Sequence, residues 1–235
     1  MSSHTILQVE NLKVNFNVTS EGDMPWTKPK KLQAVNDVSF QLNSGETLGI
    51  VGESGCGKST LARAIVKMVP THSGKVIWLG NDLLELNKSE MRHHRKQIQM
   101  IFQDPLASLD PRMNIGEIIA EPLRTHYPKT PEADVKLRVS DVMNKVGLLD
   151  NLVNRYPHEF SGGQCQRIGI ARALILKPKL IICDEPVSAL DVSIQAQVVN
   201  LLMDLQEEMG LTLIFIAHDL SIVKHISTKI MSNKN

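Results

Sequence analysis

Apolar positions along the chain follow two different periods. Short alternating or continuous apolar runs, typical of strands, lie at residues 6–18, 34–42, 47–51, 74–80, 180–183 and 211–217. Apolar residues at helical spacing lie at 59–69, 163–176 and 193–209. Because strands that alternate with helices form parallel sheets, the pattern predicts an α/β fold built on a parallel sheet.

The middle of the chain, residues 105–157, has a different pattern. It is rich in helical spacing interrupted by prolines, and PEADVKLRVSDVMNKVGLL predicts one amphipathic helix that ends at Gly147. We therefore expect a helical subdomain that interrupts the α/β core. The Gly- and Pro-containing residues 19–31 predict an exposed hairpin loop or insertion.

The composition is that of an ordinary soluble globular protein and excludes several classes of function. Hydrophobic residues make up 42% and charged residues 22% of the 235 positions. A net charge of +1 and an aromatic content of 4% argue against a nucleic-acid partner. The N-terminus shows no secretion signal, and the apolar run at 213–217 is too short to span a bilayer. Three scattered cysteines suit a reducing cytoplasm, and Cys183 is expected in the core.

The sequence GESGCGKST matches the phosphate-loop pattern G-x-x-x-x-G-K-[ST] between a predicted strand and a predicted helix. Its glycines let backbone N–H groups surround phosphate oxygens, while Lys58 supplies a positive charge and the Ser59 hydroxyl ligates Mg²⁺. We therefore predict a nucleotide site that includes Mg²⁺. Its residues are Gly52, Glu53, Ser54, Gly55, Cys56, Gly57, Lys58, Ser59 and Thr60.

Polar side chains follow three other predicted strands. LIICDEP places Asp184 and Glu185 at the carboxyl end of a buried strand, where ligands bind in open α/β sheets. Asp184 is suited to hold Mg²⁺, directly or through water, and Glu185 to polarise the attacking water. Gln103 of MIFQDP is suited to contact Mg²⁺ and that water, and His218 of IFIAHDL to bond a γ-phosphate oxygen.

A second anion-binding helix start is predicted in FSGGQCQRIGIARAL, residues 160–174. A Ser-Gly-Gly tripeptide precedes an apolar helical run. This pattern predicts a helix whose N-terminus is left bare to meet an anion.

Six motifs in order carry a family resemblance: GESGCGKST, FQD, FSGGQ, LIICDEP, SALD and AHD. Together they resemble the ATP-binding subunits of ATP-binding-cassette (ABC) transporters along almost the whole chain. The resemblance implies an α/β P-loop NTPase fold, with a RecA-like parallel sheet core, an antiparallel β subdomain and an inserted α-helical subdomain. We expect one ABC ATP-binding domain over 1–235, with 1–104 and 166–235 as the core and 105–165 as the helical subdomain.

The resemblance also implies a role for each matching residue. Phe16 would stack on adenine, Asp184 would hold Mg²⁺ and Glu185 would be the catalytic glutamate, with Gln103 and His218 beside them. Ser161, Gly162, Gly163 and Gln164, here called the signature segment, would close on the nucleotide of a neighbouring subunit. Asp191 of SALD would line the same nucleotide site. Phe160 stands where leucine is commoner in the family, an apolar exchange.

Longer segments at 78–86, 98–125, 155–202 and 209–220 resemble the oligopeptide/dipeptide permease branch of the family. This branch implies a subunit that binds and hydrolyses ATP to power oligopeptide import, at the cytoplasmic face of the bacterial inner membrane. The implied partners are a second ATP-binding subunit, identical or different, two transmembrane permease subunits and a peptide-binding receptor protein.

Two alternatives remain open at this point. Family members continue past the switch histidine with further strands, whereas this chain ends in the polar STKIMSNKN. This predicts a truncated gene product, and one alternative is therefore a catalytically impaired nucleotide-binding fragment. The other is a soluble ABC ATPase that serves no transporter.

Overall fold

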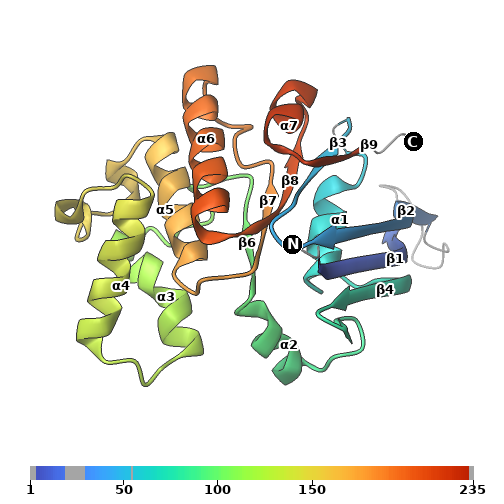
Figure 1. The fold of residues 1–235 in the computed structure, drawn as a ribbon, viewed down its shortest axis with the longest axis horizontal. Coiled ribbons are helices and arrows are strands. Elements are labelled where there is room, and N and C mark those ends of the chain that lie inside the picture. The colour runs from blue at the N-terminus through green and yellow to red at the C-terminus, as the bar shows by residue number, and fades with distance from the viewer. Residues whose placement is uncertain (1–3, 19–29, 54, 233–235) are drawn as a thin grey trace.

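The computed structural model describes residues 4–18, 30–53 and 55–232, and Figure 1 shows their arrangement around two sheets. The larger sheet has five strands in the order β6-β7-β8-β3-β9, and every recorded pair is parallel. Its strands are β3 (Thr47–Val51), β6 (Ile98–Ile101), β7 (Leu180–Asp184), β8 (Thr212–Ala217) and β9 (Lys229–Ser232). The predicted parallel sheet is therefore confirmed.

The smaller sheet has four antiparallel strands in the order β2-β1-β4-β5. They are β1 (Thr5–Val18), β2 (Lys30–Asn43), β4 (Ser73–Trp78) and β5 (Asn81–Asp82). The predicted loop between β1 and β2 falls on residues 19–29, which lie outside the described residues.

Seven α-helices in the described residues cover the sheets: α1 (Lys58–Ile65), α2 (Lys88–Arg95), α3 (Ile115–His126), α4 (Glu132–Lys145), α5 (Gly162–Leu174), α6 (Val192–Met209) and α7 (Leu220–Ile226). Two short 3₁₀ turns, η1 (Asp150–Leu152) and η2 (Pro157–Glu159), join α4 to α5. The amphipathic helix predicted before Gly147 is confirmed as α4, and Gly147 has φ +72°. Among the helices of this described part, none is both long and apolar enough to cross a bilayer.

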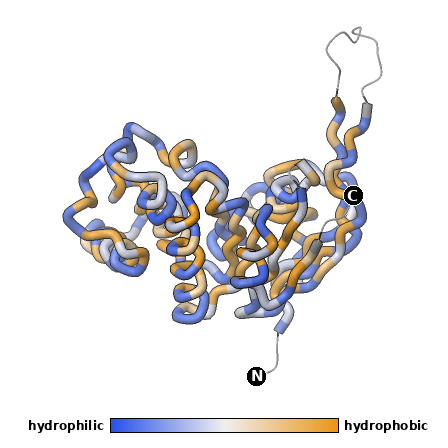
Figure 2. Tube along the Cα trace, turned by 90° about the horizontal axis from the view of Figure 1, so that it is seen from above, coloured by the Kyte–Doolittle hydropathy of each residue, from blue (hydrophilic) through white to orange (hydrophobic). Residues whose placement is uncertain are grey.

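The two-residue period of the strands divides the core into two clusters. On β8, Leu213 and Phe215 pack with helices α3 to α6, whereas Ile214 and Ile216 pack with α1 and the antiparallel sheet. Strand β7 divides in the same way, and both strands are almost wholly apolar because both of their faces are buried. Figure 2, coloured by hydropathy, shows apolar segments in the sheets as well as in the helices. Cys183 points into the first cluster, where burial raises the pKa of its thiol to about 12. The prediction that Cys183 is a core residue is confirmed.

Two local predictions were wrong. The helix expected at 59–69 ends at Ile65, because Lys67 adopts φ +53° and its ammonium donates to the carbonyls of Leu84 and Leu86. The polar chain end, expected to lack a strand, forms β9 along the edge of β3. Backbone groups make that pairing, so it does not require an apolar side-chain pattern.

The predicted boundary between residues 165 and 166 falls inside the continuous helix α5. Helices α3, α4 and α5 share one apolar cluster with β7 and β8. The division of the domain into 1–104 with 166–235 and 105–165 stays a prediction.

Candidate nucleotide site

The predicted phosphate loop, residues 52–60, joins β3 to α1 at the carboxyl edge of the parallel sheet, as the sequence predicted. Helix α1 begins after Gly57, which has φ +91° and no side chain with which to cap the helix. No acidic residue lies in the first turn. The backbone N–H groups there therefore face no competing side-chain acceptor, which suits an anion. Ser54, another predicted loop residue, lies outside the described residues.

Gly57 is required by its surroundings as well as by its backbone angle. A Cβ atom at this position would lie 1.9 Å from the carbonyl oxygen of Ala34 on β2. The loop therefore packs directly against the antiparallel sheet, and only glycine fits there.

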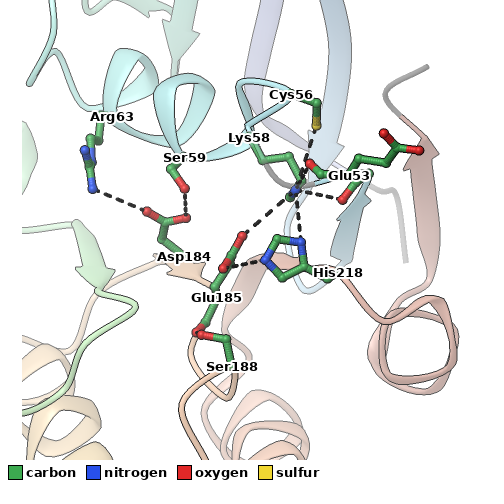
Figure 3. Close-up of polar contacts among 10 residues, drawn as sticks. Glu53, Cys56, Lys58, Ser59, Arg63, Asp184, Glu185, Ser188 and His218 are labelled. Carbon is green, nitrogen blue, oxygen red and sulfur yellow. Dashed lines mark hydrogen bonds and ion pairs between the residues drawn. The ribbon is translucent and has the colours of Figure 1, made fainter. Parts of the chain in front are cut away.

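Lys58 has a buried ammonium that is surrounded by acceptors, as Figure 3 shows. Its Nζ donates to the carbonyl oxygens of Gly52 at 2.8 Å and Glu53 at 2.7 Å, and lies 3.8 Å from Cys56 Sγ. The same nitrogen lies 3.9 Å from Glu185 Oε1 and 3.5 Å from His218 Nδ1. The structure thus brings three of the predicted residues, Lys58, Glu185 and His218, into one cluster.

Glu185 is held in an unusual conformation at the end of β7. Its φ is +50°, and its side chain is 7% exposed. The Glu185 N–H donates to the carbonyl of Ile216 at 3.1 Å, and the Ser188 hydroxyl donates to the Glu185 carbonyl at 3.1 Å. Strained residues of this kind persist where neighbouring contacts fix them, often at functional sites. The sequence analysis missed Ser188, because a serine three residues after an acid carries no distinct signal.

The carboxylate of Glu185 is paired with the imidazole of His218. Glu185 Oε2 lies 2.8 Å from His218 Nε2. A neutral imidazole with its proton on Nε2 satisfies this contact and leaves the Nδ1 lone pair facing Lys58. His218 therefore orients the carboxylate that the sequence predicts to be catalytic.

Asp184 and Ser59 meet beside this cluster. The Ser59 hydroxyl donates to Asp184 Oδ1 at 2.7 Å, and Arg63 Nη2 lies 3.9 Å from Oδ2. Burial raises the pKa of Asp184, while the Ser59 hydroxyl and the Arg63 guanidinium lower it in part. Oδ2 is buried and accepts no hydrogen bond from the described residues. The Ser59 hydroxyl and the Asp184 oxygen that accepts no hydrogen bond are oxygen ligands of the kind that Mg²⁺ prefers.

Arg63 was not predicted from the sequence, although a signal existed. Ser59 and Arg63 are four residues apart on α1, so they share one face of the helix. That spacing places a guanidinium on the same side as the predicted Mg²⁺ ligand.

The structure does not bring Gln103 into this cluster. No hydrogen bond joins its amide to Ser59, Asp184 or Glu185 in the described part of the chain. Its side chain is exposed and lines a cavity of about 730 Å³, which we call the Gln103 cavity. Arg63 lines the same cavity, so the cavity adjoins Asp184 through this side chain. Its other polar lining residues include Arg95, Asp104, Glu121 and Arg172.

The prediction that the signature segment leaves its helix start bare was wrong. Ser161 caps α5: its hydroxyl accepts from the Gln164 N–H at 3.3 Å, and Gln164 Oε1 accepts from the Ser161 N–H at 3.0 Å. This reciprocal pair is a capping box, so two of the polar groups at the helix start are already satisfied. Ser161, Gly162 and Gln164 are nevertheless exposed to solvent.

Asp191 caps the next helix beside the signature segment. Its Oδ1 accepts from Ser193 Oγ at 2.7 Å and from the Ile194 N–H at 3.0 Å, and these bonds lower the pKa of Asp191. A Cβ on Gly163 would lie 2.6 Å from Ile194 Cγ2, so the starts of α5 and α6 pack without space for a side chain. The predicted residues Asp191 and Gly163 thus belong to one surface.

Phe16 lies on β1 opposite Leu32 of β2, and it is half-buried against the antiparallel core. Leu32 is 56% exposed, so this end of the sheet presents apolar surface. Phe160 is also half-buried and packs against the helical cluster.

The chain is similar to known ATP-binding proteins over most of its length. The ABC transporter family matches residues 35–188. The oligopeptide transport ATP-binding protein OppF of Salmonella typhimurium is 67% identical over 226 residues, which cover 96% of this chain and 68% of that protein. OppF of Escherichia coli K12 is 66% identical with the same coverage, and AppF of Bacillus subtilis is 51% identical over 97% of this chain and 69% of that protein.

Solved structures of cassettes share the fold. The dimeric post-hydrolysis ATP-binding cassette MJ0796, bound to ADP and Pi, superposes with a TM-score of 0.84 at 26% identity, covering 97% of this chain and 94% of that chain. CbiO1 of Clostridium perfringens, part of the ABC transporter complex cbiONQ, superposes with a TM-score of 0.81 at 27% identity, covering 97% and 84%.

Proposed function

Because the chain belongs to the ABC transporter family of ATP-binding proteins, we propose that it hydrolyses ATP to power oligopeptide import across the bacterial inner membrane. One observation carries the catalytic part: the buried cluster in which Lys58, Glu185 and His218 converge beside the phosphate loop. The peptide cargo is supported by the 67% identity to an oligopeptide transport ATP-binding protein.

ATP binds through the phosphate loop. The backbone N–H groups at the start of α1 receive the phosphate oxygens, and Lys58 exchanges its carbonyl partners for the β- and γ-phosphates. Phe16 stacks on the adenine, with the exposed Leu32 beside it.

Ser59 and Asp184 would hold Mg²⁺ through a hydroxyl and a carboxylate oxygen, which the 2.7 Å contact already places together. Bound there, the ion would neutralise phosphate charge. Gln103 as a further ligand stays a prediction that requires its loop to approach from the Gln103 cavity.

Glu185 orients the attacking water and accepts its proton. The 2.8 Å bond from His218 fixes the carboxylate, and the left-handed backbone aims it from the end of β7. Lys58 Nζ lies 3.9 Å from Glu185 Oε1, so the cation and the carboxylate face the same space beside the phosphate loop. A bond from His218 to the γ-phosphate stays a prediction, since its Nε2 already contacts Glu185 at 2.8 Å.

The signature segment serves a second ATP-binding subunit, either another copy or a different chain. Ser161, Gly162 and Gln164 of this segment are exposed, and within the described residues no hydrogen bond joins the segment to the phosphate loop of its own chain. Two nucleotides are then sandwiched between two subunits, and the γ-phosphate stabilises the closed pair over the open one.

The remaining partners are two transmembrane permease subunits and a peptide-binding receptor. The Gln103 cavity between α2, β6 and α3 is concave and large enough for a cytoplasmic segment of a permease subunit. Docking there makes the chain a peripheral protein of the cytoplasmic face of the membrane.

Glu185→Gln tests the assignment of the base. Because the amide cannot accept a proton, we expect ATP hydrolysis to fall by at least about 100-fold while ATP binding is retained. Phosphate release and the Kd of a fluorescent ATP analogue measure the two properties. Glu132→Gln, an exposed glutamate paired with Arg124, is the control and retains hydrolysis. Persistent hydrolysis in Glu185→Gln would show that another group is the base.

Uptake of a radiolabelled tripeptide into cells tests the cargo. The chain together with its permease subunits and receptor restores uptake in a strain that lacks its own importer, and Glu185→Gln does not. If the wild-type assembly hydrolyses ATP and takes up no peptide, the oligopeptide assignment is wrong and the ATPase assignment stands.

A further inference from the structure

Helix α5 carries two arginines that bond backbone carbonyls outside the helix. Arg172 Nη1 donates to the Ser108 carbonyl at 2.6 Å, and Arg167 Nη1 donates to the Val146 carbonyl at 2.6 Å. Val146 ends α4 and belongs to the helices around α5. Ser108 instead belongs to the loop at residues 103–109, here called the Gln103 loop. Arg172 therefore links α5 to this loop, whereas Arg167 links it only to a neighbouring helix.

The Gln103 loop is a compact unit after its first residue. Asp104 Oδ1 accepts from the Ala107 N–H at 3.0 Å, the Ser108 hydroxyl donates to the Pro105 carbonyl at 2.8 Å, and the Ser108 N–H donates to the Asp104 carbonyl at 3.2 Å. Leu109 is buried in the helical cluster. Because residues 104–109 are bonded to one another, a pull on the Ser108 carbonyl moves the turn as a whole.

Arg172 also lies in the surface proposed to receive a partner. Its guanidinium lines the Gln103 cavity with Gln103, Asp104 and Glu121 of α3. Burial lowers the pKa of Arg172, and the nearby Glu121 raises it in part. Because the guanidinium of an arginine is not deprotonated in proteins, Arg172 keeps its positive charge. A segment that enters the cavity therefore meets the loop and the guanidinium that holds it.

The other end of α5 is the signature segment. The helix is continuous from Gly162 to Leu174, so a displacement at Arg172 is carried to Ser161 and Gln164 by a rigid element. Coupling requires two distinct sites, two states of the molecule and contacts that differ between those states, and α5 is the element that reaches both sites.

We propose that Arg172 is a positioning residue that fastens the Gln103 loop to α5, so that a partner segment in the Gln103 cavity shifts the signature segment. The inference rests on the proposed function, since it takes the occupant to be a permease subunit. Arg172 touches neither the nucleotide nor the reacting atoms in this role.

The first test uses the free chain and needs no partner. In Arg172→Gln, hydrogen exchange of the backbone amides at 104–109 becomes about tenfold faster, because the charged donor to Ser108 is lost. Arg167→Gln is the matched control, with an equally short bond from the same helix, and leaves exchange at 104–109 unchanged. The Kd for a fluorescent ATP analogue stays within twofold in both variants.

The second test uses the complete transporter in nanodiscs. The stimulation of ATP hydrolysis by receptor and peptide falls about tenfold in Arg172→Gln and is kept in Arg167→Gln. Arg172→Lys, which retains a cationic donor, recovers part of the stimulation. Melting temperatures of all three variants separate this effect from a general loss of stability.

Three outcomes overturn the proposal: unchanged exchange at 104–109 in Arg172→Gln, equal loss of stimulation in both glutamine variants, or a loss that only follows melting temperature. A wild-type chain that gains no activity from permease subunits contradicts the proposed function instead. In that case the exchange measurement still decides whether Arg172 holds the Gln103 loop.

Discussion

The chain contains two helix starts that sequence analysis predicts to face phosphate, and the structure prepares them in opposite ways. Helix α1 begins at a left-handed Gly57, has no side-chain cap and carries the buried Lys58 in its first turn. Helix α5 begins at an extended Ser161, which forms a capping box with Gln164, and lies exposed at the surface. The first has its polar groups free and a cation beside them, whereas two polar groups of the second already bond each other in the cap.

The two helix starts also differ in the charged groups that lie beside them. At α1 the cation, the acid Glu185 and the imidazole of His218 already converge. At α5 the side chains that pack against Gly162 and Gly163 are Leu190 and Ile194, which are apolar. The signature segment is therefore suited to complete a site whose charged groups come from another subunit.

The largest expected effect lies at α1. Lys58→Ala removes the buried cation, and ATP affinity falls about 100-fold because charge-assisted bonds to phosphate are lost. Lys67→Ala is the matched control, since Lys67 also bonds two carbonyls through its ammonium but lies at the other end of α1. It lowers the melting temperature and leaves the Kd for ATP unchanged, as equilibrium dialysis measures. Equal affinity losses in both variants would contradict a phosphate role for Lys58.

The glycines of the phosphate loop separate steric fit from backbone strain. Gly57→Ala places Cβ 1.9 Å from the Ala34 carbonyl, and we expect the free energy of unfolding to fall by about 3 kcal/mol or more. Gly55 also has a positive φ, of +80°, but a Cβ there meets no atom within 4 Å. Gly55→Ala is therefore expected to lower the same free energy by only about 1 kcal/mol. Denaturant unfolding measures both, and similar losses would mean that contact with β2 is unimportant.

The signature segment is tested by its cap. Ser161→Ala removes the acceptor of the capping box and lowers the free energy of unfolding by about 1 kcal/mol. Asn114→Ala removes the equivalent cap of α3 and lowers it by a similar amount. Only Ser161→Ala slows ATP hydrolysis by the assembled pair of subunits, and neither variant changes ATP binding by the free chain. Slower hydrolysis in both variants would show that Ser161 acts only by stabilising its helix.

The smallest effect is the pH dependence of the cap at Asp191. Bonds from Ser193 and from the Ile194 N–H lower the pKa of Asp191 below its ordinary value of 3.8. Its contribution to stability is therefore present above pH 3.8 and is lost as the pH falls through the lowered pKa. Wild type melts slightly above Asp191→Asn at neutral pH, and the difference vanishes in acid. A difference that is the same at every pH would show that the charge is not involved.

Much of the fold follows from local patterns in the sequence. The strands at 47–51 and 180–183 and the helices α4, α5 and α6 were predicted because periodicity and terminal residues agree there, and β7 extends one residue further, to Asp184. The end of α1 and the strand β9 were not, because tertiary bonds of Lys67 and the free edge of β3 decide them. Ser188 and Arg172, which support the site, carry no motif and are visible only through the atoms they contact, whereas Arg63 has only its spacing from Ser59 as a signal.

By itself the sequence determined the phosphate loop, the order of the other motifs and the strand ends on which Asp184, Glu185 and His218 lie, because glycine content and apolar periodicity are local properties. Only the tertiary structure decided that Lys58, Glu185 and His218 form one cluster and that Gln103 lies in a separate cavity. Those facts depend on hydrogen bonds and ion pairs between residues that lie as many as 160 positions apart, which no local pattern encodes.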